Sequence, residues 1–163
     1  MQTFWHRTQK SCITLQAGFN DCQKGRGARA NRYVPTIELK RILHVEDDPS
    51  IRMVATLALE KVGKFQVLSC ESGQQALEKA VAYDPQVILL DVMMPLMDGP
   101  STLSHLREVI DLTGRLVLFM TAKVQQKEID HYMALGAFAV IIKPFDPMTL
   151  SQQIQEHWAA FHA

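Results

Sequence analysis

From Lys40 onward, the chain alternates between short apolar runs and longer stretches in which apolar residues recur every three to four positions. Short aliphatic runs bounded by turn residues are typical of buried strands, and the longer periodic stretches are typical of amphipathic helices. A helical stretch follows each apolar run. This order predicts an α/β fold, with five helices covering both faces of a five-stranded parallel sheet. The five predicted strands are residues 41–45, 65–70, 87–91, 115–120 and 138–142.

Capping residues mark where several of the predicted helices begin. The first and last helices are each preceded by an aspartate and a proline, at 48–49 and 146–147. Aspartate is a good N-cap, and proline is tolerated in the first turn because it lacks only a donor that would stay unpaired. Ser72 and Gln75 have the spacing of a capping box ahead of the second helix.

The strongest chemical signal surrounds Asp91. The unbroken apolar run 87–90 ends in this carboxylate, and a turn-rich loop containing Pro95 and Gly99 follows. A carboxylate directly after a buried strand needs a partner, because burying an unpaired charge is costly. Ligands of open parallel sheets bind at the carboxyl ends of the strands, which is where Asp91 is expected.

Three other strand ends carry residues of matching chemistry. Glu46 and Asp47 follow the first predicted strand, Thr121 follows the fourth and Lys143 follows the fifth. Carboxylates are ligands that Mg²⁺ accepts, and an ionised Asp91 is a suitable nucleophile toward a phosphoryl group. A lysine and a hydroxyl are suited to binding phosphoryl oxygens. The sequence therefore predicts a divalent-metal and phosphoryl site at one edge of the sheet.

Some of these residues have a simpler structural interpretation when taken singly. Asp48, next to Pro49, fits a helix cap better than a metal ligand. Asp98-Gly99 is a turn signal. His44 lies inside the first predicted strand, and we expect a hydrogen-bonded core or edge histidine there rather than a ligand.

Charge divides the chain into two parts. Residues 1–37 hold six Lys or Arg and one acid, whereas the remainder holds 11 Lys or Arg and 16 acids. We expect 1–37 to be a basic, flexible extension and 38–163 to be the folded domain. The basic character would suit nucleic acid or an acidic partner, but an extension without such a role is favoured. No apolar run is long enough for a membrane span and no secretory signal is recognised, so we expect a cytoplasmic protein.

Taken together, four motifs resemble the receiver domain of two-component response regulators over roughly residues 39–160. They are ILHVEDDPSIR, VILLDVMMPLMDG, FMTA and IIKPF, in this order. The resemblance implies the flavodoxin-like receiver fold with strand order 2-1-3-4-5. It also implies a signalling phospho-acceptor that catalyses only its own phosphorylation and dephosphorylation, and is not otherwise an enzyme.

The resemblance also assigns roles to individual residues. Asp91 matches the phospho-acceptor, and Thr121 and Lys143 match the switch hydroxyl and the switch lysine. Lys143 is followed by a proline, and the family has a cis peptide bond there. The donor would be a phosphohistidine on a sensor histidine kinase or phosphotransfer protein.

By the same resemblance, the cofactor is Mg²⁺. Its ligands would be Glu46, Asp47, Asp91 and the backbone carbonyl of Met93, with Glu46 acting through water. The family usually has Tyr or Phe three residues before the lysine, where this chain has Val140. Strand alternation predicts that Phe138 points to the same face as Val140.

We expect a stand-alone receiver whose output passes through an unknown protein target, and a homodimer stays open. The main alternative is a pseudo-receiver, a constitutive interaction module that is not phosphorylated. A phosphatase with an Asp nucleophile would need a second acid where this chain has Met93. A flavin carrier of the same fold would need a phosphate loop where the acidic residues 46–48 stand.

Overall fold

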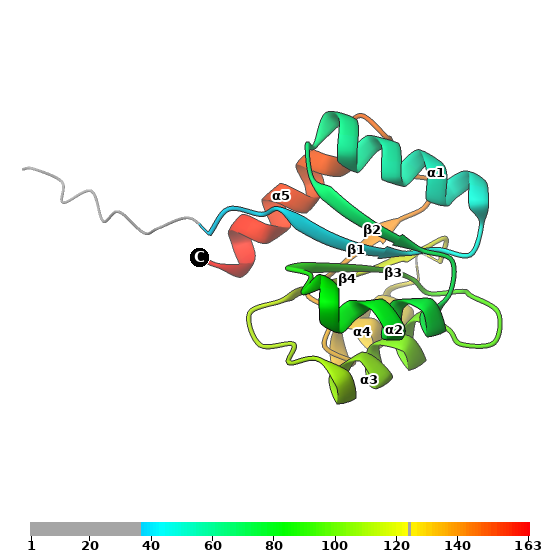
Figure 1. Cartoon of the computed structure of the whole chain (residues 1–163). Helices are drawn as coiled ribbons and strands as arrows, with labels where there is room; N and C mark the ends of the chain where they lie inside the picture. Colours follow the sequence, from blue (N-terminus) through cyan, green and yellow to red (C-terminus); the bar gives the residue numbers. More distant parts are fainter. Residues whose placement is uncertain (1–36, 124) are drawn as a thin grey trace, which may run out of the picture. The chain divides into compact units, whose positions relative to one another are not determined.

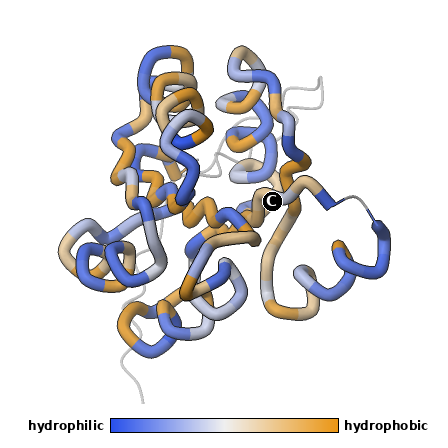
Figure 2. Tube along the Cα trace, turned by 90° about the vertical axis from the view of Figure 1, so that its right-hand side faces the viewer, coloured by the Kyte–Doolittle hydropathy of each residue, from blue (hydrophilic) through white to orange (hydrophobic). Residues whose placement is uncertain are grey.

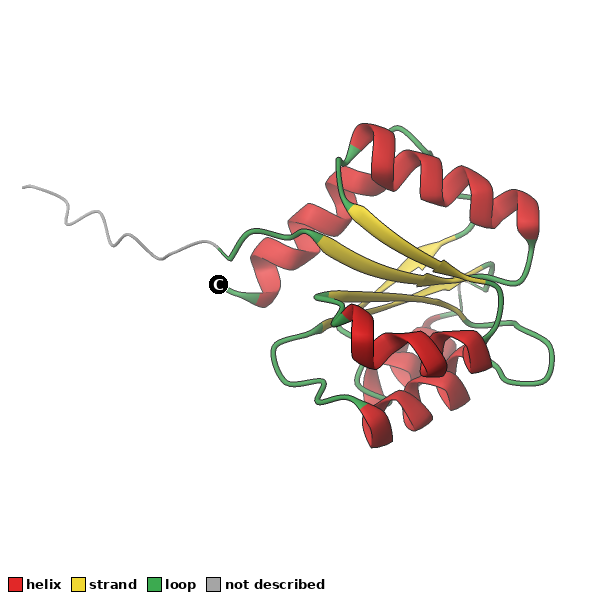
Figure 3. Cartoon of the chain, viewed as in Figure 1, coloured by secondary structure: helices red, strands yellow, loops and turns green. Residues whose placement is uncertain are grey.

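The computed structural model describes residues 37–123 and 125–163, and this part of the chain is a sheet between two layers of helices (Figures 1 and 3). The sheet is parallel throughout, and its order is β2-β1-β3-β4-β5. The predicted fold and strand order are therefore confirmed. The strands are β1 (Arg41–Val45), β2 (Gln66–Cys70), β3 (Val87–Asp91), β4 (Leu116–Thr121) and β5 (Ala139–Ile142).

The helices cover both faces of the sheet (Figure 1). Helices α1 and α5 lie on one face, and α2, α3 and α4 lie on the other. None of the helices in the described residues is both long and apolar enough to cross a membrane. The helices are α1 (Pro49–Leu57) with its π-helical continuation η1 (Ala58–Val62), α2 (Gly73–Tyr83), α3 (Gly99–Val109), α4 (Gln126–Ala134) and α5 (Leu150–Phe161).

Strand alternation divides the buried side chains into two cores. Leu43 and Leu90 belong to the core beneath α2, α3 and α4, whereas Ile42 and Leu89 belong to the core beneath α1 and α5. Every residue of β3 is buried, as expected for the central strand of a sheet covered on both faces. Figure 2, a view from the right-hand side of Figure 1, shows hydrophobic positions in the middle of the trace and an alternation of hydrophobic and hydrophilic positions around the helices.

The helix boundaries confirm some capping predictions and correct others. Asp48 caps α1 and the Ser72 hydroxyl accepts a hydrogen bond from the Gln75 backbone N–H, both as predicted. Asp98, interpreted as a turn residue, is the N-cap of α3 and accepts from the Ser101 backbone N–H. The last helix begins at Leu150 rather than directly after Asp146-Pro147, because the Asp146 carboxylate caps a preceding turn instead.

The prediction that Phe138 shares a face with Val140 is wrong. Val140 packs against the core beneath α4, whereas Phe138 packs with the core beneath α5. The Phe138 ring lies edge-on to Phe161, with 5.5 Å between the ring centroids. β5 begins only at Ala139, so Phe138 precedes the strand and does not follow its alternation. Phe138 therefore does not replace the aromatic side chain that receiver domains usually have at the position of Val140.

Candidate functional site

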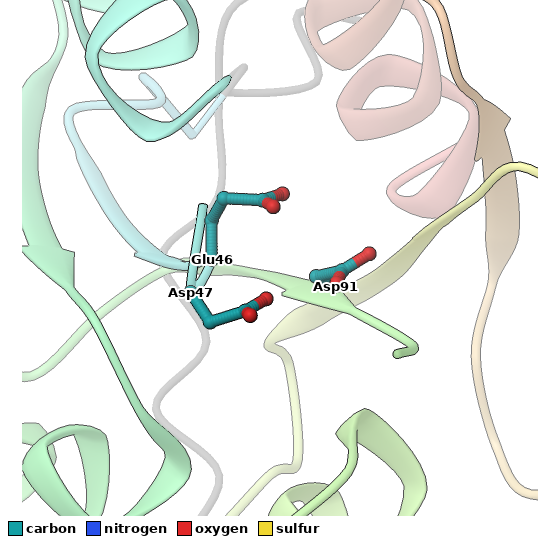
Figure 4. Close-up of side chains that lie close together, drawn as sticks. All are labelled: Glu46, Asp47 and Asp91. Carbon is teal, nitrogen blue, oxygen red and sulfur yellow. The ribbon is translucent and has the colours of Figure 1, made fainter. Parts of the chain in front are cut away.

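Four of the five strands deliver polar residues to the same edge of the sheet. Glu46 and Asp47 follow β1, Asp91 ends β3, Thr121 ends β4, and Lys143 follows β5. The strands are parallel, so their carboxyl ends meet at one rim. Figure 4 shows the carboxylates of Glu46, Asp47 and Asp91 converging from two neighbouring strands. One oxygen atom from each of these three carboxylates lies within 4.8 Å of the other two.

Lys143 joins two of these carboxylates. Its Nζ donates hydrogen bonds to Glu46 Oε2 at 2.5 Å and to Asp91 Oδ1 at 2.6 Å. The Lys143 backbone N–H also donates to the Thr121 carbonyl at 2.8 Å, which fixes the end of β5 beside β4. The cis peptide bond expected between Lys143 and Pro144 is present. The predicted lysine is thus the direct partner of the predicted acceptor.

Burial dominates the electrostatics of the cluster. Glu46 and Asp91 are 1% and 4% exposed, and this burial raises the pKa of both carboxyl groups. The hydrogen bonds from Lys143 oppose the rise, and the neighbouring carboxylates add to it. Burial alone would lower the pKa of Lys143, but its hydrogen bonds to Asp91 and Glu46 raise it. A single lysine therefore balances only part of the negative charge.

The composition of the cluster fits a hard divalent cation. Mg²⁺ prefers oxygen ligands and usually keeps several bound waters, so a few protein carboxylates are enough to hold it. The three adjacent carboxylates of the cluster provide such ligands. A bound cation would also relieve the repulsion that raises the carboxyl pKa values. Asp48 is not part of the cluster, because its carboxylate accepts hydrogen bonds from the backbone N–H groups of Ser50 and Ile51.

The other two residues predicted for the site lie at its border. Thr121 is fully buried, and its Oγ1 accepts a hydrogen bond from the Lys123 backbone N–H at 3.1 Å. Among the described residues, this hydroxyl is therefore bonded to the chain that follows β4 and not to Asp91 or Lys143. The Met93 side chain is 63% exposed on the loop after β3. The role of the Met93 carbonyl as a metal ligand stays a prediction.

Two residues near the site differ from expectation or were missed. His44 is fully buried, but neither ring nitrogen has a hydrogen-bond partner among the described residues. The prediction that this histidine is hydrogen-bonded is therefore wrong. Burial, followed by the charges of Lys143 and Arg52, lowers the pKa of His44 to about 3.

Arg52 was not singled out from the sequence, although helical side chains lean toward the helix N-terminus and hence toward the acidic pair.

An apolar groove of about 430 Å³ opens beside the cluster. It lies between the first turns of α1 and the loop after β5, with Lys143 at its edge. The remaining residues that line it are Ser50, Ile51, Val54, Ala122, Pro144 and Phe145.

Comparison with known proteins agrees with this geometry. The family model for the response regulator receiver domain matches residues 42–155. The chemotaxis protein CheY of Bacillus subtilis is 36% identical over 105 residues, which are 64% of this chain and 86% of CheY. The alkaline phosphatase synthesis transcriptional regulatory protein PhoP of the same species is 33% identical over 71% of this chain and 47% of PhoP. The chain spans about half the length of several curated relatives that it matches.

Solved structures give the same result. The chemotaxis response regulator CheY4 of Vibrio cholerae superposes with a TM-score of 0.67 at 29% identity, covering 74% of this chain and 99% of CheY4. A CheY-like receiver domain protein from Methanospirillum hungatei gives a TM-score of 0.66 at 27% identity, covering 76% of this chain and 97% of that one. The fold, the family model and the convergence of residues at the strand ends lead to one conclusion. This chain belongs to the receiver domain family of two-component response regulators.

Proposed function

We propose that this protein is a phosphorylation switch in which Asp91 accepts a phosphoryl group with the help of Mg²⁺. The observation that carries the proposal is the contact of Lys143 with both Asp91 and Glu46 inside a buried acidic cluster. A lysine committed to two carboxylates, with a third carboxylate beside them, suits a site that takes up a cation and a phosphoryl group together. Glu46, Asp47, Asp91 and the Met93 carbonyl would hold the metal.

The chemistry follows from the position of Asp91. One Asp91 oxygen attacks phosphorus, the bond from phosphorus to the donor atom breaks, and the donor leaves with the electron pair of that bond. Mg²⁺, when bound, neutralises charge that develops on the phosphoryl oxygens. Lys143 supplies a fixed positive charge beside the same oxygens, and Thr121 supplies a hydroxyl at the end of β4.

The new phosphoryl group would act by shifting a conformational equilibrium. It can do so only as far as it binds one conformation better than the other. The Thr121 hydroxyl is bonded to Lys123 in the present conformation, so a move toward the phosphoryl oxygens would break that hydrogen bond. With Val140 at the usual aromatic position, the region from β4 to α4 would carry the signal without an inward-swinging ring.

The proposed donor is a phosphohistidine on a sensor kinase or a phosphotransfer protein. Receiver domains interact with such proteins, and the apolar groove beside Lys143 offers a docking surface next to Asp91. Replacing Val54 in this groove with Glu should slow transfer from a protein donor and leave phosphorylation by a small donor unchanged. We further propose a cytoplasmic regulator with its receiver at 38–163, a basic extension at 1–37 and an unknown protein target.

The direct test is incubation of the full chain with Mg²⁺ and acetyl phosphate, followed by intact-mass measurement. We expect the gain of one phosphoryl group, which is lost with Asp91→Asn and in a Mg²⁺-free sample. If no phosphoryl group appears, sensor kinases are tested as donors. Failure with both kinds of donor would contradict the proposal and favour the pseudo-receiver, a constitutive interaction module.

A further inference from the structure

Arg52 on α1 contacts the backbone of both acidic residues that follow β1. Its Nη1 donates hydrogen bonds to the Glu46 carbonyl at 2.6 Å and to the Asp47 carbonyl at 2.9 Å. The Arg52 side chain is only 20% exposed, and its other terminal nitrogen lies 3.9 Å from the Glu71 carboxylate. The guanidinium is therefore held in place on the backbone side of the metal cluster.

These two carbonyls lie where the strand has ended and the helix has not begun. The neighbouring polar groups have their own partners. The Glu46 backbone N–H donates to the Cys70 carbonyl, the Asp48 carboxylate caps α1, and the Asp48 carbonyl accepts from the Arg52 backbone N–H. Backbone groups in such a turn need partners when they are shielded from water. Arg52 supplies the partner for both carbonyls through one nitrogen atom.

We propose that Arg52 is a positioning residue for the metal site, an inference that rests on the proposed function. Glu46 and Asp47 each present a carboxylate to the cluster and a carbonyl to Arg52. By fixing both carbonyls, the guanidinium fixes the two peptide planes and hence the directions in which the two side chains leave the backbone. Groups that orient metal ligands in this way contribute to metal affinity without touching the metal.

The charge of Arg52 allows positioning to be separated from electrostatics. A positive charge near a cation site repels the cation, so its removal should strengthen Mg²⁺ binding if only Coulomb forces acted. Loss of positioning should weaken Mg²⁺ binding. The two effects have opposite signs in Arg52→Met. Arg52→Lys keeps the charge but replaces the planar guanidinium with a single ammonium group.

Arg115 provides a matched control. Its side chain is also 20% exposed, and it also donates to backbone carbonyls, those of Pro85 and Asp111. It lies before β4, at the opposite end of the sheet from the acidic cluster. Arg115→Met therefore removes a comparable set of hydrogen bonds without touching the turn that carries Glu46 and Asp47.

The experiment is calorimetric titration of the full chain with Mg²⁺, for the unmodified protein, Arg52→Met, Arg52→Lys and Arg115→Met. We expect about 10-fold weaker binding in Arg52→Met, a smaller loss in Arg52→Lys and no change in Arg115→Met. Phosphorylation by acetyl phosphate gives a second readout. The Mg²⁺ concentration for half-maximal rate should rise in the Arg52 variants, while the rate at saturating Mg²⁺ stays within about twofold.

Unchanged or tighter Mg²⁺ binding by Arg52→Met would overturn the inference, and so would an equal loss in Arg115→Met, which would indicate general destabilisation. Urea unfolding of each variant shows whether it is folded. If Arg52→Met does not fold, Arg52→Lys decides the question by the same comparison. Absence of Mg²⁺ binding by the unmodified protein would overturn both the inference and the metal site of the proposed function. Equal Mg²⁺ affinity in the unmodified protein and in the Arg52 variants would overturn the inference alone.

Discussion

The two ends of the sheet arrange the same kinds of charge in opposite proportions. At the carboxyl end, Lys143 pairs with Glu46 and Asp91, and the carboxylate of Asp47 lies beside them. At the amino end, the single carboxylate of Asp84 accepts hydrogen bonds from two arginines. These are Arg41 at 2.6 Å and Arg115 at 2.7 Å. The cluster at the carboxyl end has more carboxylates than cationic partners, whereas Asp84 alone has two cationic partners.

The carboxyl groups at the two ends also differ in the direction and cause of their pKa shifts. Burial raises the pKa of Glu46 and Asp91, whereas the hydrogen bond and charge of Arg115, together with Arg41, lower the pKa of Asp84. Asp84 also has a 57% exposed side chain, so water supports its charge. The amino end is therefore complete as folded. At the carboxyl end, buried carboxylates stay only partly neutralised, and the proposed cation would neutralise them further. Binding sites commonly trade stability for function in this way.

The largest effect is expected from removing Lys143, the lysine that pairs with two carboxylates of the cluster. Lys143→Met leaves Glu46 and Asp91 buried without their partner, which should lower the free energy of unfolding by about 3 kcal/mol at neutral pH. Mg²⁺ should restore part of the loss, because it neutralises the same carboxylates. Urea unfolding with and without Mg²⁺ measures both quantities. A loss that Mg²⁺ does not reduce would contradict the assigned metal site.

Mg²⁺ itself should distinguish the two ends. At a Mg²⁺ concentration of about 100 times its dissociation constant, the free energy of unfolding should rise by about 2.7 kcal/mol. Asp47→Asn should reduce this gain, because it removes a carboxylate from the cluster. Asp84→Asn should keep the full gain. Equal gains in the two variants would mean that Mg²⁺ stabilises the protein elsewhere.

His44 should make the carboxyl end sensitive to mild acid in Mg²⁺-free buffer. Its pKa is lowered to about 3 in the folded protein from an ordinary value of 6.5, so below 6.5 the unfolded chain binds a proton that the folded chain does not. The stability that comes from keeping His44 neutral is fully present above pH 6.5 and is lost as pH falls toward 3. By about pH 5 the loss amounts to about 2 kcal/mol of the free energy of unfolding. His44→Leu should remove it, with unfolding measured at about pH 7.5 and about pH 5. Parallel profiles for the two proteins would refute this expectation.

The smallest effect is expected at the amino end. The lowered pKa of Asp84 means that its contribution is present above its ordinary pKa of 3.8 and is lost as pH falls through the lowered value. Asp84→Asn should slightly lower the melting temperature at neutral pH, and the difference should vanish in strong acid. Salt should also reduce it, because exposed ion pairs are screened. A difference that grew in acid would have the wrong sign.

The sequence alone determined the fold and which polar residues lie together at the carboxyl edge of the sheet. Hydrophobic periodicity identifies five strands and five helices, because burial on both faces of a parallel sheet requires apolar runs followed by amphipathic stretches. Parallel strands bring their carboxyl ends to one rim, so the strand-end positions of Glu46, Asp47, Asp91 and Lys143 predict that these residues lie together. These are consequences of local pattern and of connection rules.

Only the tertiary structure decided which of these groups touch. The contact of Lys143 with Glu46 spans 97 residues of sequence, and no local pattern specifies such a contact. The same holds for the ring of His44, which has no hydrogen-bond partner among the described residues, and for the packing of Phe138 against α5. The hydrogen bonds from Arg52 to the Glu46 and Asp47 carbonyls are local in sequence, but they form only because α1 is oriented so that Arg52 reaches the turn after β1. Pairing, burial and charge balance arise from packing between distant segments, and these decide how the site works.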